Sequence, residues 1–147
     1  MNIVEPIFIQ CRGKPAELAL AAPGTEFNFV SYGRLARCVN NVCHRVISAG
    51  IPSRSRVAVY IDDPIFHTII LIALTRLGIV TISGKDKNAA LRFQVNAVIA
   101  DKPFSNRAES MMLADTSWFA GDDRPIAREH IDRGLPEDVC RIMLTSG

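Results

Sequence analysis

The alternation of apolar and polar positions predicts that the chain begins with a hairpin followed by a long helix. Two short apolar runs, at residues 18–22 and 27–30, flank the turn-forming tripeptide Pro23-Gly24-Thr25 and predict a β-hairpin. From Tyr32 onward, apolar side chains recur every three or four residues, as on one face of an amphipathic helix. Ser31 is its candidate N-cap and Gly50 its candidate terminating glycine. The polar face of this helix would carry Arg34, Arg37, Asn41, Arg45 and Ser48.

The middle of the chain predicts strands that alternate with helices. Apolar runs at 56–61, 79–82 and 97–100 are candidate strands, with one helix over 65–77 and a shorter one from Asp86 through Val95. Strands this apolar, joined by helices, indicate a parallel sheet with right-handed crossovers. In such sheets, ligands bind beyond the carboxyl ends of the strands.

Other segments give weaker signals. Residues 7–11, 111–114 and 117–120 are candidate strands, 121–136 is loop-like with room for a short helix, and 139–144 is a candidate final strand. The predicted helix at 65–77 is apolar nearly all round and must be buried on more than one side. In so short a chain there is little partner surface to cover it.

Composition narrows the class of protein. The 147 residues suffice for about one domain, and 48% hydrophobic with 22% charged residues allows a buried core. The 17 basic and 15 acidic side chains are scattered, which argues against a nucleic-acid or anionic-membrane partner. The N-terminus lacks the basic start of a signal peptide, and no clean apolar run reaches the roughly 20 residues of a membrane span.

Individual reactive side chains favour structural roles. The four cysteines, at positions 11, 38, 43 and 140, lack metal-site spacing and indicate reduced, buried thiols in a cytoplasmic protein. His44 is expected in solvent on the first helix, and His67 is expected as a core or interface residue. Asp62 and Asp63 are interpreted as a helix cap. No catalytic set and no metal-ligating set is predicted.

The end of the chain carries the one candidate binding motif. Thr145, Ser146 and Gly147 follow a predicted strand, and small hydroxyl residues with glycine can turn backbone N–H groups and hydroxyls toward phosphate oxygens. Taken alone, the tripeptide is equally compatible with a simple turn.

The stretch P-E-D-V-C-R-I-M-L-T-S-G at 136–147 resembles the approach to the phosphate-binding loop of the adenylate-forming superfamily. This superfamily contains acyl-CoA synthetases, adenylation domains of peptide synthetases and luciferases, and its loop runs T-S-G-[ST]-T-G-x-P-K-G. Four upstream segments resemble family motifs in the same order: F-V-S-Y-G-R-L at 29–35, A-G-I at 49–51 with V-A-V-Y-I at 57–61, L-I-A-L-T-R-L-G-I-V at 71–80 and A-V-I-A-D at 97–101. Three positions depart from the pattern: Ser55-Arg56 for Gly-Asp, Ser83-Gly84 for a proline-containing stretch, and Arg34 for Glu.

The resemblance implies an α/β fold with a mostly parallel, twisted sheet and helices on both faces, preceded by a small β-hairpin. Residues 1–147 would form a partial N-terminal AMP-binding domain with a hairpin at 17–30, a helix at 31–49 and a βαβαβ unit at 56–101. The chain would be truncated within the phosphate-binding loop, of which Thr145, Ser146 and Gly147 are the cofactor-binding residues that can be carried over.

The implied activity is that of an ATP-dependent acid–thiol ligase. Members of the family use ATP and Mg²⁺ to convert a small carboxylic acid to an acyl-adenylate, then transfer the acyl group to coenzyme A or a carrier-protein pantetheine. This chain alone is expected to be inactive, to bind none of these cofactors tightly and to self-associate.

Two other functions stay open. The chain could be a non-catalytic interaction or oligomerisation module of degenerate adenylation-domain type, docking through the helix at 65–77. A small nucleotide-binding regulator ranks last, because neither G-x-G-x-x-G nor G-x-x-x-x-G-K-[ST] occurs.

Overall fold

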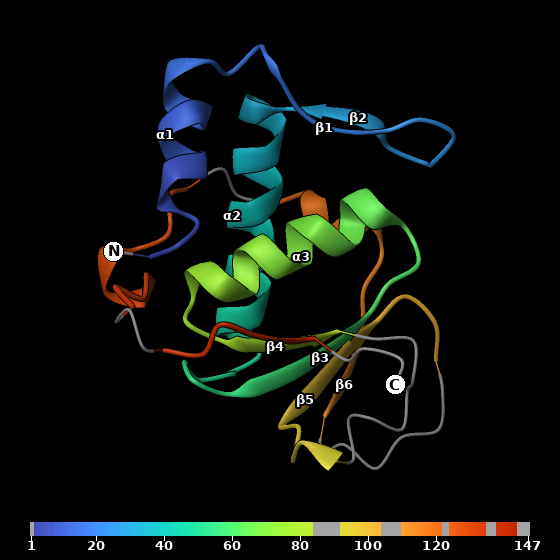
Figure 1. Ribbon diagram of the computed structural model, residues 1–147, viewed down its shortest axis with the longest axis vertical. Coiled ribbons are helices and arrows are strands. Elements are labelled where there is room, and N and C mark those ends of the chain that lie inside the picture. The colour runs from blue at the N-terminus through green and yellow to red at the C-terminus, as the bar shows by residue number, and fades with distance from the viewer. Residues whose placement is uncertain (1, 84–91, 104–109, 122–123, 135–137, 144–147) are drawn as a thin grey trace.

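A five-stranded parallel sheet with helices packed against it forms the centre of the molecule (Figure 1). The computed structural model describes residues 2–83, 92–103, 110–121, 124–134 and 138–143. The strands are β3 (Arg56–Tyr60), β4 (Val80–Ser83), β5 (Ala97–Ala100), β6 (Met111–Leu113) and β7 (Arg141–Met143). Their order is β6-β5-β3-β4-β7 and every pair is parallel, which confirms the predicted sheet.

The predicted hairpin and first long helix are also present. Strands β1 (Leu18–Ala22) and β2 (Asn28–Ser31) pair antiparallel, and α2 (Tyr32–Ser48) follows at once. The Ser31 hydroxyl accepts a hydrogen bond from the Arg34 backbone N–H at 3.3 Å, so the predicted cap is real. Gly50 ends the helix with φ +73°, a conformation that costs glycine little.

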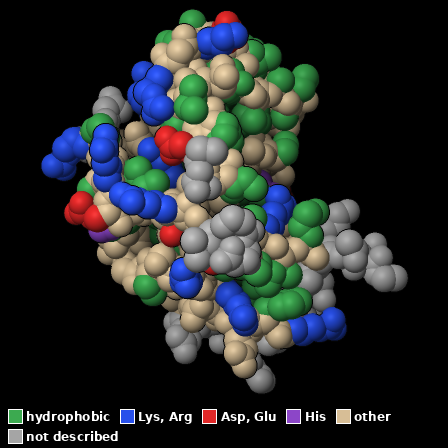
Figure 2. Space-filling view, turned by 60° about the vertical axis from the view of Figure 1, so that its left-hand side comes forward, with side chains coloured by type: hydrophobic (Ala, Val, Ile, Leu, Met, Phe, Trp, Pro, Cys, Tyr) green, Lys and Arg blue, Asp and Glu red, His purple; other side chains and the backbone are tan. Residues whose placement is uncertain are grey.

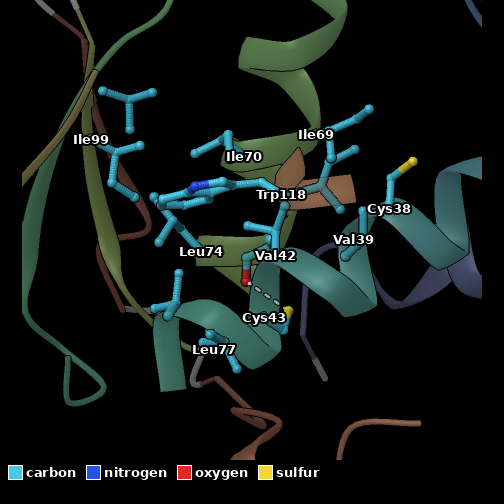
Figure 3. Close-up of a cluster of buried hydrophobic side chains, with 14 of the residues drawn as sticks. Cys38, Val39, Val42, Cys43, Ile69, Ile70, Leu74, Leu77, Ile99 and Trp118 are labelled. Carbon is cyan, nitrogen blue, oxygen red and sulfur yellow. Dashed lines mark hydrogen bonds between the residues drawn. The ribbon is translucent and has the colours of Figure 1, made fainter. Parts of the chain in front are cut away.

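Helix α3 (Pro64–Arg76) is covered within this chain. It packs against α2 on one side and against β3, β4 and the hairpin on others. Ile69, Ile70 and Leu74 are fully buried, and Figure 3 shows them facing Val39 and Val42 of α2. The surface that covers this helix therefore comes from this chain, because the long amphipathic helix before it packs against α3.

The opposite face of the sheet has a smaller apolar cluster. Ala58, Ile82, Val98 and Ala100 are buried there, with Phe93 and Val95 packed against them. Most of the predicted helix at 86–95 lies outside the described residues, although Arg92 is helical. Because strand side chains alternate between the two faces, β3 and β5 contribute to both clusters.

Two candidate strands are helical instead. Residues 7–11 belong to α1 (Glu5–Gly13), which packs on α2 and buries Phe8 and Cys11. Residues 117–120 lie largely in a 3₁₀ helix, η1 (Thr116–Phe119), where the Asp115 carboxylate accepts a hydrogen bond from the Ser117 N–H at 2.8 Å. Side-chain capping of this kind competes with strand pairing over so short a run. A second 3₁₀ turn, η2 (Arg128–His130), lies in the segment predicted as a loop.

Three polar or reactive side chains differ from expectation. Asn41 is buried rather than on the wet face of α2, and its Nδ2 donates to the Phe119 carbonyl at 2.8 Å. His44 is half-buried and its Nε2 lies 2.9 Å from the Arg124 carbonyl oxygen. All four cysteines are free thiols, but Cys140 is exposed, because the segment before β7 lies at the sheet's edge. No helix of the described part is both long and apolar enough to cross a bilayer.

Candidate functional site

The carboxyl edge of the sheet gathers the polar residues that follow the strands. In the register of the parallel pairs, Tyr60 lies beside Ala100, Val59 beside Ser83, and Ser83 beside Met143. The carboxyl ends of β3, β4, β5 and β7 therefore lie at one edge of the sheet. Polar groups separated by many residues in the sequence can meet there.

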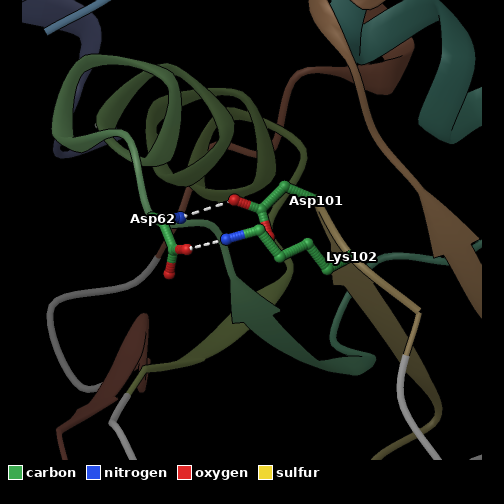
Figure 4. A network of polar contacts seen from close by, with 3 residues as sticks. All are labelled: Asp62, Asp101 and Lys102. Carbon is green, nitrogen blue, oxygen red and sulfur yellow. Dashed lines mark hydrogen bonds and ion pairs between the residues drawn. The ribbon is translucent and has the colours of Figure 1, made fainter.

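Asp62, Asp101 and Lys102 meet where the chain connections diverge. The connection after β3 runs to β4 on one side, whereas the connection after β5 runs to β6 on the other. Between β3 and β5, the Asp62 backbone N–H donates to Asp101 Oδ2 at 2.8 Å, and the Lys102 ammonium pairs with the Asp62 carboxylate (Figure 4). The hydrogen bond to the Asp62 carboxylate raises the pKa of Lys102. These contacts join the two loops at the carboxyl ends of β3 and β5, the part of the sheet where doubly wound folds bind ligands.

Asp63, the neighbour of Asp62, has a different role. Its carboxylate accepts a hydrogen bond from the Phe66 backbone N–H at 2.8 Å and caps α3. The cap interpretation is therefore confirmed for Asp63 and wrong for Asp62, which points to Lys102. The cap therefore holds the first turn of α3 at the same edge of the sheet as Asp62, Asp101 and Lys102.

His67 and Ser83 form the second polar pair of this edge. His67 Nε2 lies 3.4 Å from Ser83 Oγ, so α3 and the last residue of β4 are linked. Burial lowers the pKa of the His67 imidazole, and the positive charge of Arg141 lowers it further. The ring is therefore neutral at pH 7 and can exchange hydrogen bonds with a hydroxyl, as expected for a satisfied core histidine.

Strand β7, which precedes the predicted phosphate-binding residues in the sequence, ends beside this pair. Its last residue, Met143, is the register partner of Ser83. Thr145, Ser146 and Gly147 themselves lie outside the described residues, so their role stays a prediction. Among the described residues, no group of three or more His, Cys, Asp or Glu side chains is placed to hold a metal ion.

A buried cation was missed by the sequence analysis. The Arg76 guanidinium, at the end of α3, stacks on the Phe8 ring at 3.8 Å and donates to Asn40 Oδ1 at 2.7 Å. Its Nε has no hydrogen-bond partner among the described residues. The arginine is 9% exposed because α1, which was predicted as a strand, lies over it. Only the tertiary placement of α1 reveals this contact.

Solved structures provide the match. The N-terminal subdomain of NpsA from Klebsiella oxytoca superposes with a TM-score of 0.84 and 15% identity, over 99% of this chain and 39% of that one. The chain has the fold of the N-terminal subdomain of adenylate-forming enzymes. A fatty acyl CoA synthetase of Mycobacterium tuberculosis superposes with a TM-score of 0.76 and 18% identity, over 99% of this chain and 32% of that one. The nonribosomal peptide synthetase FmoA3 superposes with a TM-score of 0.78 and 18% identity, over 99% of this chain and 16% of that one.

The likeness is one of fold, since the sequence identities are low. No protein-family model matches the chain, and no curated protein matches it. The chain spans about two fifths or less of the length of each of these three solved proteins. The predicted fold class is confirmed by these neighbours.

Proposed function

We propose that this chain is the N-terminal part of an ATP-dependent acid–thiol ligase. The whole enzyme would convert a small carboxylic acid to an acyl-adenylate and pass the acyl group to coenzyme A or a carrier-protein thiol. The observation that supports this most strongly is the superposition of 99% of the chain on adenylation-type and acyl-CoA synthetase structures. The sequence position of Thr145-Ser146-Gly147, shortly after the parallel strand β7, agrees with it.

In this proposal the chain contributes scaffold and the start of a phosphate clamp. The backbone N–H groups and hydroxyls of Thr145 and Ser146 would donate to phosphate oxygens of ATP, and Gly147 would allow the close approach. Mg²⁺ would be held together with those phosphates by residues beyond this chain. Charge neutralisation and alignment are the catalytic contributions expected of such a loop. The chain by itself would then form no adenylate. We also infer a cytoplasmic location, which the four free thiols support.

The first test is to determine which amino acids the gene encodes after residue 147. The proposal expects a continuation resembling [ST]-T-G-x-P-K-G, and expects the longer polypeptide to catalyse exchange of pyrophosphate with ATP in the presence of one acid from a panel of fatty, aromatic and amino acids. The 147-residue chain should show no exchange. In the longer polypeptide, Ser146→Ala should reduce exchange at least about tenfold, whereas the matched surface variant Ser117→Ala should not. A frame without the loop residues, or a longer polypeptide inactive with every acid, would refute the proposal.

The second candidate is an interaction or oligomerisation module of degenerate adenylation type. Large apolar side chains that are more than half exposed favour it: Ile3, Ile9, Leu18, Phe29, Leu113, Val139 and Met143. Sedimentation velocity on the 147-residue chain separates the candidates when combined with the exchange assay. Self-association that Phe29→Ser abolishes, together with a longer polypeptide that lacks exchange, would favour the module.

A further inference from the structure

A cavity lies at the end of the sheet opposite the predicted phosphate loop. It has a volume of about 610 Å³, within the roughly 300–1,000 Å³ usual for small-molecule sites. Gly78, Ile79 and Val80 form its wall at the start of β4, and Val139 and Cys140 form the wall before β7. The N-terminal segment closes it with Asn2, Ile3 and Pro6. Figure 2 shows this side of the molecule, where apolar, basic and acidic side chains lie together.

The charges in this cavity do not balance. Its lining includes Arg54, Asp132 and Asp138, and Arg54 pairs with Asp138 at 4.0 Å. That leaves Asp132, which has no ion-pair partner within the described ranges of the chain and is half-buried. The lining thus combines apolar walls with one carboxylate that no cation of the described residues neutralises.

Asp132 is held firmly in place by its backbone. Its N–H donates to the Arg76 carbonyl at 3.0 Å, and its own carbonyl accepts from Asn2 Nδ2 at 2.9 Å. Its side chain lies against Gly78, where an added Cβ would be 2.6 Å from the Asp132 Cβ. The backbone is thus held at two points, and the side chain lies against Gly78 in the cavity wall. A preorganised carboxylate next to an apolar surface suits a ligand with a cationic head and an apolar body.

We propose that this cavity binds small primary amines that carry an apolar body. The ammonium group pairs with the Asp132 carboxylate, and the apolar body packs along Ile79, Val80 and Val139. The site lies at the amino ends of β4 and β7, whereas the predicted phosphate loop follows the carboxyl end of β7. It is therefore separate from the proposed ligase function and can be tested on the 147-residue chain alone.

Cys140 provides a built-in reporter of occupancy. It lines the cavity and is the one exposed thiol of the four, whereas Cys11, Cys38 and Cys43 are buried. Burial also raises the pKa of these three thiols, that of Cys43 to about 12, which keeps them protonated and unreactive. Alkylation by iodoacetamide, followed by mass spectrometry, should therefore report on Cys140.

The experiment compares three probes of one shape: 4-phenylbutylamine, 4-phenylbutan-1-ol and 4-phenylbutyrate. The amine should bind about fivefold or more tightly than the alcohol, and the carboxylate should bind most weakly. At saturation the amine should slow alkylation of Cys140 at least about threefold, by covering one side of the thiol. Backbone amide shifts in ¹H–¹⁵N spectra should concentrate at residues 79, 80, 139 and 140.

Three variants make the test decisive. Asp132→Asn should erase the preference for the amine over the alcohol, whereas Asp62→Asn, at the other end of the sheet, should leave it unchanged. Val139→Trp fills the cavity from a position that is 61% exposed in the native chain, so it should block all three probes without disturbing the core. Equal affinity for the three probes, a preference that survives Asp132→Asn, or no saturable shift at the four amides would each overturn the proposal.

Discussion

The two neighbouring aspartates before α3 allow a sharp test of the site's architecture. Asp63 accepts a hydrogen bond from the Phe66 N–H at 2.8 Å, whereas the Asp62 side chain lies 78% exposed and faces Lys102. Asp63→Ala removes both the acceptor and a negative charge at the helix N-terminus. Removing an N-cap costs about 1 kcal/mol, and the lost interaction with the helix dipole adds about 0.3–1 kcal/mol. We therefore expect Asp63→Ala to lower the free energy of unfolding by about 1–2 kcal/mol.

The control is the adjacent residue. Asp62→Ala should change the free energy of unfolding by less than about 0.5 kcal/mol, because its carboxylate is exposed and its backbone N–H bond to Asp101 remains. Asp63→Ser keeps an acceptor at the cap and should recover most of the loss.

Urea unfolding measures these differences. Trp118 is the single tryptophan and is 7% exposed, so its fluorescence reports on the core, while circular dichroism reports on the helices. For a chain of this length, the Asp63→Ala loss corresponds to a melting temperature lower by about 3–6 °C. Equal losses in the two alanine variants, or no recovery in Asp63→Ser, would show that the assigned cap is incorrect.

Two further variants probe the opposite ends of β4. Gly78→Ala should lower the free energy of unfolding by at least about 2 kcal/mol, because φ is +69° and the new Cβ would meet the Asp132 side chain. Gly13→Ala adds a Cβ that meets nothing within 4 Å and should leave the free energy of unfolding unchanged in the same urea titration. The pKa of His67 is lowered from its ordinary value of 6.5 in the folded chain, so the unfolded chain binds a proton more readily as the pH falls toward that value. The free energy of unfolding should therefore fall as the pH drops through 6.5, and His67→Gln should flatten this dependence; an unchanged pH profile would contradict it.

The sequence predicts those elements whose signals are local. Helix α2 has a clear apolar stripe, a serine that caps its start and a glycine after its end, and all three are present in the structure. The strand predicted at residues 7–11 was wrong. Ile7 and Ile9 alternate as in a strand, but the buried residues are Val4, Phe8 and Cys11, which have helical spacing. In so short a segment, both periods fit, and packing against α2 decides between them.

The candidate site is less predictable because it depends on strand order. Asp62 and Asp101 come directly after the strands predicted at 56–61 and 97–100, but their hydrogen bond requires β5 to pair with β3. The sequence of neither strand alone indicates that β3 and β5 pair. The cavity is still harder to foresee, since its walls come from segments near residues 2–6, 54, 75–80 and 132–140.

Strand order also explains why the polar groups of this chain separate into two ends. Strands β4 and β7 are paired in register. The cavity at the amino end of β7 is lined by Val139 and Cys140, whereas the predicted phosphate loop follows Met143 in the sequence. Only three residues, Arg141–Met143, connect these ends. A strand this short is a single rigid unit when it is hydrogen-bonded to β4. If the amine site and the phosphate loop both exist, occupancy at the amino end should change amide exchange at β7, and a β7 unaffected by saturating 4-phenylbutylamine would show that the two ends act independently.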